Sequence, residues 1–112
     1  MIKVQVSFAG KDCALHVYGH SGYAEAGSDI VCAAISSMVM LTLNTVTERF
    51  GCKAVIKTDE RKAEIDAKVV DYTPEAEGII KQFAREAWEI SLDYPENVTV
   101  IADFLKGEIH NA

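Results

Sequence analysis

The stretch that decides the fold is Lys62-Ala63-Glu64-Ile65-Asp66-Ala67-Lys68-Val69, in which charged and apolar residues alternate strictly. A period of two is typical of a strand with one face in the core and the other in solvent. Residues Lys53–Thr58 predict its partner strand, because Asp59-Glu60 between the two segments supplies turn chemistry. The pattern therefore predicts a hairpin whose apolar face packs against other elements.

A helix should follow this hairpin. Thr73-Pro74 favours its start, since a proline at the first helical position loses no hydrogen bond there. Tyr94-Pro95 marks its end, and its apolar stripe consists of Ala76, Ile80, Phe83, Ala87 and Ile90. We expect Asn97–Phe104 to form a last strand, with a frayed tail from Lys106 onward.

A second hairpin is predicted at the N-terminus. Its first strand has one apolar face, made of Ile2, Val4, Val6 and Phe8. Ala9–Asp12 forms the turn. In the second strand of this hairpin, we expect Leu15 and Val17 on one face and Ala14, His16 and Tyr18 on the opposite face.

A long helix should follow a loop over residues 20–28. Ser28-Asp29 predicts its N-cap, since both side chains accept hydrogen bonds from first-turn amides. It should run to Phe50 and stop at Gly51, a residue suited to a left-handed C-cap. The resulting ββα-ββα-β order predicts a single α+β domain over residues 1–112, with two helices packed on a mostly antiparallel five-stranded sheet.

Composition narrows the class of protein. A chain of 112 residues with 49% hydrophobic and 25% charged residues has room for one core. The net charge of -6 argues against direct nucleic-acid binding and favours a basic partner. The N-terminal alternation is no signal peptide, so we expect a cytoplasmic protein without a membrane partner.

The predicted long helix carries an unusual apolar surface. Residues Ile30–Thr47 contain no charge, although six of them are Ser, Thr or Asn, which is too polar for a membrane span. One small sheet cannot cover so much apolar helix surface. We therefore expect part of this helix to lie at a twofold interface between two copies of the chain, as a homodimer.

Cys32 is the residue that most suggests chemistry. With Asp29 as the cap, it would be the third helical residue, where the helix macrodipole stabilises a thiolate. The alternative is a buried small hydrophobic residue, which is the commoner role of a lone cysteine. The three cysteines form no CxxC pair, so we expect neither a metal site nor another cofactor.

His20 is the candidate partner of Cys32. It ends a strand just before the loop that leads into the helix, and a histidine beside a thiol can take its proton and protonate a leaving amine. A surface histidine is the alternative. His16 is a rival base, but it lies in mid-strand, and His110 lies in the tail.

Two further residues could support such a site. Asp29 caps the helix or orients His20, and the two roles can coexist. Ser36 lies one turn after Cys32, where its hydroxyl either bonds back to the Cys32 carbonyl or makes a polar contact in the site. The spacing of Gly19, Gly22 and Gly27 does not fit a phosphate-binding loop, and we interpret these glycines as hinges.

The ribosomal-processing cysteine proteases, the Prp family, have a signature that closely resembles residues 19–36, Gly-His-Ser-Gly-Tyr-Ala-Glu-Ala-Gly-Ser-Asp-Ile-Val-Cys-Ala-Ala-Ile-Ser. The resemblance implies that Cys32 is the nucleophile and His20 its general base and acid, with Asp29 and Ser36 in support. It also implies a homodimeric endopeptidase that removes a short N-terminal extension from a large-subunit ribosomal protein, cutting after an aromatic residue.

From these features we expect a peptide to bind extended beside the Cys32 helix. The loop Ser21–Ser28, with Gly22, Tyr23 and Gly27, would close over this peptide. Tyr23 would contact the ring of the aromatic substrate residue that precedes the cleaved bond. Two other functions stay open. One is a non-catalytic module that docks on a ribosomal protein and uses Cys32 only for packing. The other is a thiol redox sensor, although no resolving cysteine is evident nearby.

Overall fold

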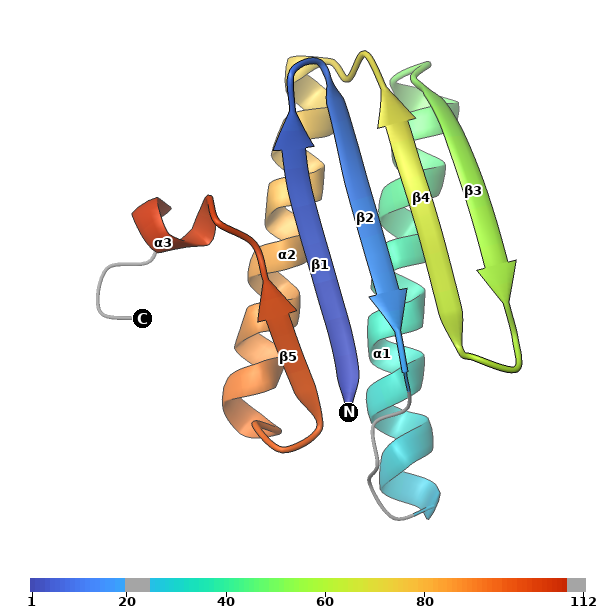
Figure 1. The fold of residues 1–112 in the computed structure, drawn as a ribbon, viewed down its shortest axis with the longest axis vertical. Coiled ribbons are helices and arrows are strands. Elements are labelled where there is room, and N and C mark those ends of the chain that lie inside the picture. Colours follow the sequence, from blue (N-terminus) through green and yellow to red (C-terminus); the bar gives the residue numbers. More distant parts are fainter. Residues whose placement is uncertain (20–24, 109–112) are drawn as a thin grey trace.

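The computed structural model describes residues 1–19 and 25–108, and for residues 25–29 and 108 it describes the backbone alone. Five strands form one mixed sheet in the order β3-β4-β2-β1-β5 (Figure 1). Their bounds are β1 Ile2–Ala9, β2 Asp12–Tyr18, β3 Lys53–Asp59, β4 Glu64–Val70 and β5 Val98–Ile101. All neighbours are antiparallel except β1 and β5, so the mostly antiparallel sheet is confirmed.

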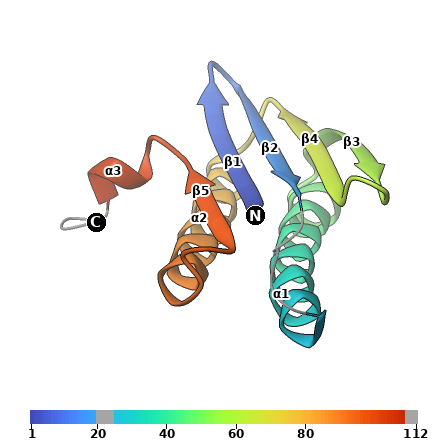
Figure 2. The ribbon, with the colours of Figure 1, turned by 60° about the horizontal axis from the view of Figure 1, so that its bottom comes forward.

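Two long helices cover one face of this sheet and leave the other open (Figure 2). They are α1 Glu25–Asn44, continued by the π-helical turn η1 Thr45–Arg49, and α2 Pro74–Asp93. The short helix α3 Leu105–Glu108 lies to the side of the sheet, beyond β5 (Figure 2). The expected ββα-ββα-β order is confirmed, with α3 as an addition. A two-layer arrangement explains why β1, β2 and β4 bury only alternate residues.

The core lies between the sheet and the two long helices. The strands contribute Ile2, Val4, Val6, Leu15, Val17, Ala67 and Val69, all at most 5% exposed. The helices contribute Val31, Ile35, Val39 and Leu43 from α1, and Ala76, Ile80, Phe83 and Ala87 from α2. The predicted strand faces and the α2 stripe are therefore confirmed, except that Phe8, Ile65 and Ile90 are only half-buried.

The long helix α1 is a core helix on its inner side. The segment Ile30–Arg49 is long and apolar enough to cross a membrane by length and composition alone. Core helices of soluble proteins pass the same test, and here every third or fourth residue of α1 packs under the sheet. Its end agrees with expectation, since Phe50 is the C-cap and Gly51 follows with φ +68°.

The start of α1 differs from the sequence-based expectation. The helix begins at Glu25, so Asp29 is not its N-cap and Gly27 belongs to the helix rather than to a loop. Glutamate and alanine are strong helix formers, and one glycine costs a helix only about 1 kcal/mol. The helix preference of Glu25 and Ala26 therefore outweighs Ser28-Asp29 as the signal for the start of this helix.

The C-terminal segment also differs. β5 ends at Ile101, and Lys106 lies in α3 rather than in a frayed tail. The chain turns away from the sheet because Ala102 and Leu105 are buried and Phe104 packs edge-on against Phe8, with ring centroids 5.5 Å apart. Tertiary packing thus ended a strand that local β-propensity would have continued.

Candidate active site

Cys32 lies in a small cavity of about 30 Å³ where several elements meet. Its walls come from the start of β1, the end of β2, the inner side of α1 and the β3–β4 turn. They are Ile2, Val17, Gly19, Cys32, Ile35, Ser36 and Ala63. The thiol is half-buried, which leaves it partly open to an incoming group.

The other two cysteines lie in the core. Cys13 is buried in β2, and burial raises the pKa of its thiol from 9.0 to about 12. Cys52 is buried as well, with its Sγ 3.9 Å from Oγ1 of Thr73. Since a thiolate is the reactive form, Cys32 is the one cysteine of the chain whose surroundings suit a nucleophile.

The helix macrodipole is not what distinguishes Cys32. Because α1 begins at Glu25, Cys32 is its eighth residue and not its third. The dipole acts mainly within the first turn, so the expected placement at the positive end was wrong. Cys32 differs from the other two cysteines in the partial exposure of its thiol and in the cavity that its side chain lines.

Gly19 brings the chain that enters His20 to the wall of the Cys32 cavity. Its φ is +93°, and a Cβ atom at this position would lie 2.4 Å from the backbone oxygen of Met1. Only glycine fits both constraints. The hinge expected at Gly19 is therefore a position of close backbone approach.

The predicted loop residues His20, Gly22 and Tyr23 lie outside the described residues, as does His110. Asp29 is described by its backbone alone, as the fifth residue of α1. The pairing of His20 with Cys32 therefore stays a prediction.

His16 occupies the opposite face of the sheet from Val17. Its Nε2 lies 2.6 Å from Oε2 of Glu64, and its ring stacks on Tyr18 at a centroid distance of 4.2 Å. Since Val17 lines the Cys32 cavity and side chains alternate along a strand, His16 points away from the thiol. This placement leaves His16 with a cross-strand role.

A groove of about 310 Å³ adjoins the Cys32 cavity and shares three wall residues with it, Val17, Ser36 and Ala63. Its other walls are Thr58, Asp59, Glu60, Glu64 and Ile65. Ser36 is exposed and lies at the junction of the cavity and the groove, where its hydroxyl is open to a polar contact. The groove has an apolar floor and an acidic rim.

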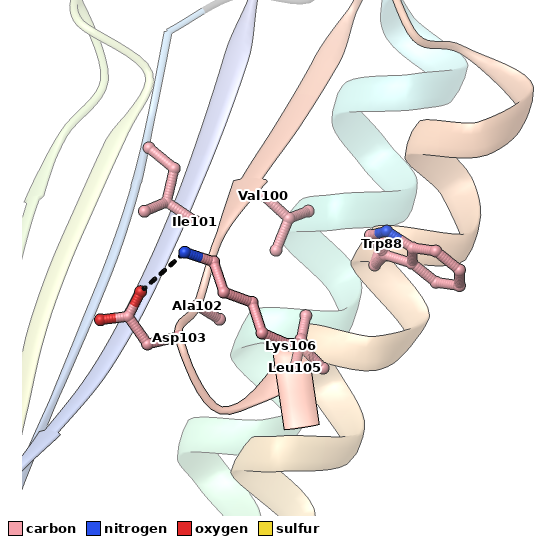
Figure 3. A pocket seen from close by; sticks show the side chains of 7 residues that line it. All are labelled: Trp88, Val100, Ile101, Ala102, Asp103, Leu105 and Lys106. Atoms are coloured by element: carbon pink, nitrogen blue, oxygen red, sulfur yellow. Dashed lines mark ion pairs between the residues drawn. The ribbon is translucent and has the colours of Figure 1, made fainter. Parts of the chain in front are cut away.

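A larger cavity, of about 360 Å³, lies elsewhere. It is formed by Trp88 of α2 and by the chain from the end of β5 to the start of α3 (Figure 3). Lys106 and Asp103 form an ion pair of 3.9 Å at its rim. None of its walls belongs to the Cys32 cavity or the groove, and it contains no thiol or histidine, so size alone does not mark the site.

In the part of the chain that the structure describes, no group of three His, Cys, Asp or Glu side chains is placed to hold a metal ion. The site that remains is a half-buried thiol beside a groove in a two-layer α+β domain. These features define a candidate thiol-dependent enzyme.

Comparison with known proteins identifies the family. The sequence model of the cysteine protease Prp family matches residues 1–99, and the chain belongs to that family of cysteine proteases. No curated protein matches the chain. The sequence resemblance drawn from residues 19–36 is thus confirmed at the level of the family.

Solved structures agree with the fold. The essential ribosomal processing protease Prp from S. aureus, in complex with a covalently linked product peptide, is 24% identical with a TM-score of 0.80; the match covers 91% of this chain and 99% of that one. The same protease in complex with a substrate peptide is 22% identical with a TM-score of 0.75, and the match covers 91% of this chain and 99% of that one. SMU.848 from Streptococcus mutans is 23% identical with a TM-score of 0.78, and the match covers 91% of this chain and 93% of that one.

Proposed function

We propose that this protein is a ribosomal-processing endopeptidase that removes a short N-terminal extension from a large-subunit ribosomal protein, cutting after an aromatic residue. The observation that carries the proposal is that Cys32, in a chain of the Prp family, shares its cavity with Gly19, the residue directly before His20. The S. aureus relative, whose fold this chain shares, is a ribosomal processing protease with a bound peptide. We place its action in the cytoplasm, where ribosomal proteins are made.

The proposed mechanism uses two groups of the chain. His20 takes the proton of the Cys32 thiol, and Sγ attacks the carbonyl carbon of the scissile bond. The tetrahedral intermediate collapses as the His20 imidazolium gives its proton to the leaving amine, which leaves an acyl thioester on Cys32. Water, deprotonated by His20, then hydrolyses the thioester and restores the thiol. Asp29 orients His20 in this scheme, and Ser36 makes polar contacts with the substrate.

The groove suits an extended peptide beside α1. Val17, Ala63 and Ile65 give it apolar walls, and Asp59, Glu60 and Glu64 give it an acidic rim, with no basic residue among the described residues that line it. Ribosomal proteins bind RNA and are basic, so the rim and the net charge of -6 favour their approach. The loop from Ser21, with Gly22 and Tyr23, forms the remaining wall in this proposal.

The cleavage site tests this proposal. A ribosomal protein with an N-terminal extension should be cut after an aromatic residue, as read from the mass of the product. Changing that residue to alanine should cost about 2 kcal/mol or more in transition-state binding, through lost buried area. Salt should lower kcat/KM more for the whole basic protein than for a short neutral peptide. Equal cleavage of the alanine and aromatic substrates would contradict the substrate assignment.

We also propose a homodimer built on the outer face of α1. Ile30 and Leu41 are each 66% exposed there, and no charged residue occurs between Asp29 and Glu48. An uncharged helix face with exposed large apolar side chains is typical of an interface. The dimer joins two copies of the same surface.

Leu41→Glu should break this dimer, because it places a charge in an apolar contact. Light scattering at micromolar concentration should give twice the chain mass of 12.3 kDa for the native protein and once that mass for the variant. Leu92→Glu is the matched control, since Leu92 is a 56% exposed leucine on α2. A native protein that is monomeric at this concentration would disprove the dimer.

A further inference from the structure

We propose that the groove beside the Cys32 cavity binds a lysine or arginine side chain of the substrate, with Glu60 as the specificity-determining residue that pairs with its charge. This inference rests on the proposed function and deepens it, because it assigns one residue of the substrate to one part of the site. It concerns recognition at short range, whereas the net charge of the chain acts on the approach of the whole substrate.

The groove lies where a substrate residue close to the cleaved bond would enter. It shares Val17, Ser36 and Ala63 with the cavity that holds the Cys32 thiol. An extended peptide advances about 3.3 Å per residue, so a side chain in the groove belongs to a residue within a few positions of the bond that Sγ attacks. The groove therefore acts on the sequence around the cleavage site.

The walls of the groove suit a long side chain with a positive end. Val17, Ala63 and Ile65 are apolar, and the groove of about 310 Å³ carries its carboxylates at the rim. Lysine and arginine bury their aliphatic stems along apolar surface and keep the charged end near water. An apolar side chain would leave the rim without a partner, and an acidic one would be repelled by it. The walls and the rim together therefore favour a basic residue.

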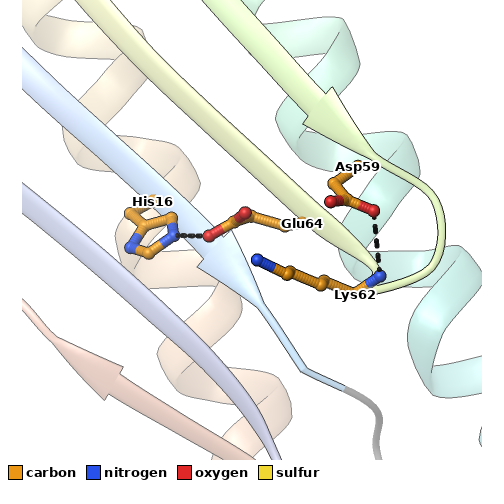
Figure 4. A network of polar contacts seen from close by, with 4 residues as sticks. All are labelled: His16, Asp59, Lys62 and Glu64. Atoms are coloured by element: carbon orange, nitrogen blue, oxygen red, sulfur yellow. Dashed lines mark hydrogen bonds and ion pairs between the residues drawn. The ribbon is translucent and has the colours of Figure 1, made fainter.

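Two of the three rim carboxylates already have partners. Oδ1 of Asp59 accepts hydrogen bonds from the backbone N–H groups of Arg61 at 3.0 Å and Lys62 at 3.2 Å. Oε2 of Glu64 lies 2.6 Å from Nε2 of His16. Figure 4 shows the bond from Lys62 to Asp59 beside the His16–Glu64 pair. Asp59 thus stabilises the β3–β4 turn, and Glu64 serves a cross-strand contact.

Glu60 is the rim carboxylate that is open to an incoming cation. It is exposed at the first position of the turn, directly after β3. Its carbonyl accepts the N–H of Ala63 at 3.2 Å, and the bonds of Asp59 hold the same turn from the preceding residue. The backbone of Glu60 is therefore fixed at the rim before a substrate arrives, and a preorganised group loses less freedom on binding.

The experiment uses peptides that contain the aromatic cleavage residue and a single lysine, placed in turn at each position on either side of the scissile bond. Norleucine at the same position is the reference, since it keeps the stem and lacks the ammonium group. We expect one position at which the native protein prefers lysine over norleucine by about fivefold in kcat/KM, through a lower KM. Glu60→Gln should remove this preference and leave kcat nearly unchanged.

A charge exchange tests whether the contact is direct. Glu60→Lys should prefer glutamate over lysine at that same position by about fivefold. Screening confines such position-dependent effects to charges within about 10 Å of each other. Glu89→Gln is the matched control, because Glu89 is an exposed glutamate on α2 that lines neither the groove nor the Cys32 cavity. It should keep the native preference for lysine.

Binding without cleavage separates this inference from the proposed function. In the Cys32→Ala protein, fluorescence anisotropy of labelled peptides should give a Kd for the lysine peptide that is lower than for the norleucine peptide by the same factor. Adding Glu60→Gln should make the two Kd values equal. If the native protein cuts no peptide while this difference in Kd is present, the proposed function is wrong and the role of Glu60 stands.

The opposite result is equally clear. If the peptides are cut, but lysine is preferred at no position or is preferred equally by the native protein and Glu60→Gln, the role of Glu60 is wrong and the proposed function stands. An equal loss of preference in Glu89→Gln would trace the effect to net charge and would also overturn the role of Glu60.

Discussion

Cys32→Ala should abolish cleavage, with a loss of at least about 10⁴-fold in kcat, because it removes the sulfur that attacks the substrate in the proposed mechanism. Alanine keeps the helical conformation of α1, and Cys32 is only half-buried, so the fold should survive. Loss of ribosomal-protein cleavage, together with an unchanged unfolding transition, is the expected measurement.

Histidine variants supply the controls. His20→Ala should slow cleavage strongly, since in the proposed mechanism the thiol loses its general base. His16→Ala should matter little, because His16 pairs with Glu64 on the open face of the sheet, and His110→Ala should be equally silent. If the Cys32→Ala protein still cuts at the normal rate, the nucleophile lies elsewhere. If the native protein binds the ribosomal protein but never cuts it, the chain is a non-catalytic binding module.

Gly19→Ala should lower both the free energy of unfolding and kcat, with the second largest effect among the variants. The new Cβ would lie 2.4 Å from the Met1 oxygen, on backbone that already has φ +93°, so β1 and β2 must shift. We expect a loss of about 2–4 kcal/mol in the free energy of unfolding and a lower kcat, because the same shift moves His20. Urea unfolding and cleavage rates measure the two effects.

Gly10→Ala is the matched control for this substitution. Gly10 also has a positive φ, +61°, but a Cβ there would meet no atom within 4 Å. It should cost only about 1 kcal/mol, from backbone strain alone, and leave cleavage unchanged. Equal losses of unfolding free energy in the two variants would show that the close contact with Met1 does not contribute to the effect of Gly19→Ala.

Sequence patterns predicted most of the fold because they act locally. The strict alternation before Val69 predicts which face of β4 is buried, and the cap at Thr73 with its proline predicts where α2 starts. At Thr73 the side chain accepts the N–H of Ala76 at 3.1 Å, as a helix cap should. Each of these signals depends on a few neighbouring residues.

The patterns failed where two local signals competed or where distant packing decided. At the start of α1, the preference of Glu25 and Ala26 for helix outweighed the capping signal of Ser28-Asp29. At the end of β5, contacts of Phe104 with Phe8 and burial of Leu105 turned the chain away from the sheet. Neither result is visible in a window of a few residues.

The candidate site divides in the same way. The signature around Cys32 is contiguous, so the sequence by itself determined the family, the candidate nucleophile and its candidate partner. The surroundings of the thiol come from Gly19, Cys32 and Ala63, which are distant along the chain and meet only when β2, α1 and the β3–β4 turn pack together. The left-handed backbone of Ala63 has no sequence signal, because alanine adopts it only when tertiary contacts outweigh its own preference. Local chemistry therefore determined which residues are candidates for reaction, and long-range packing decided which residues surround Cys32.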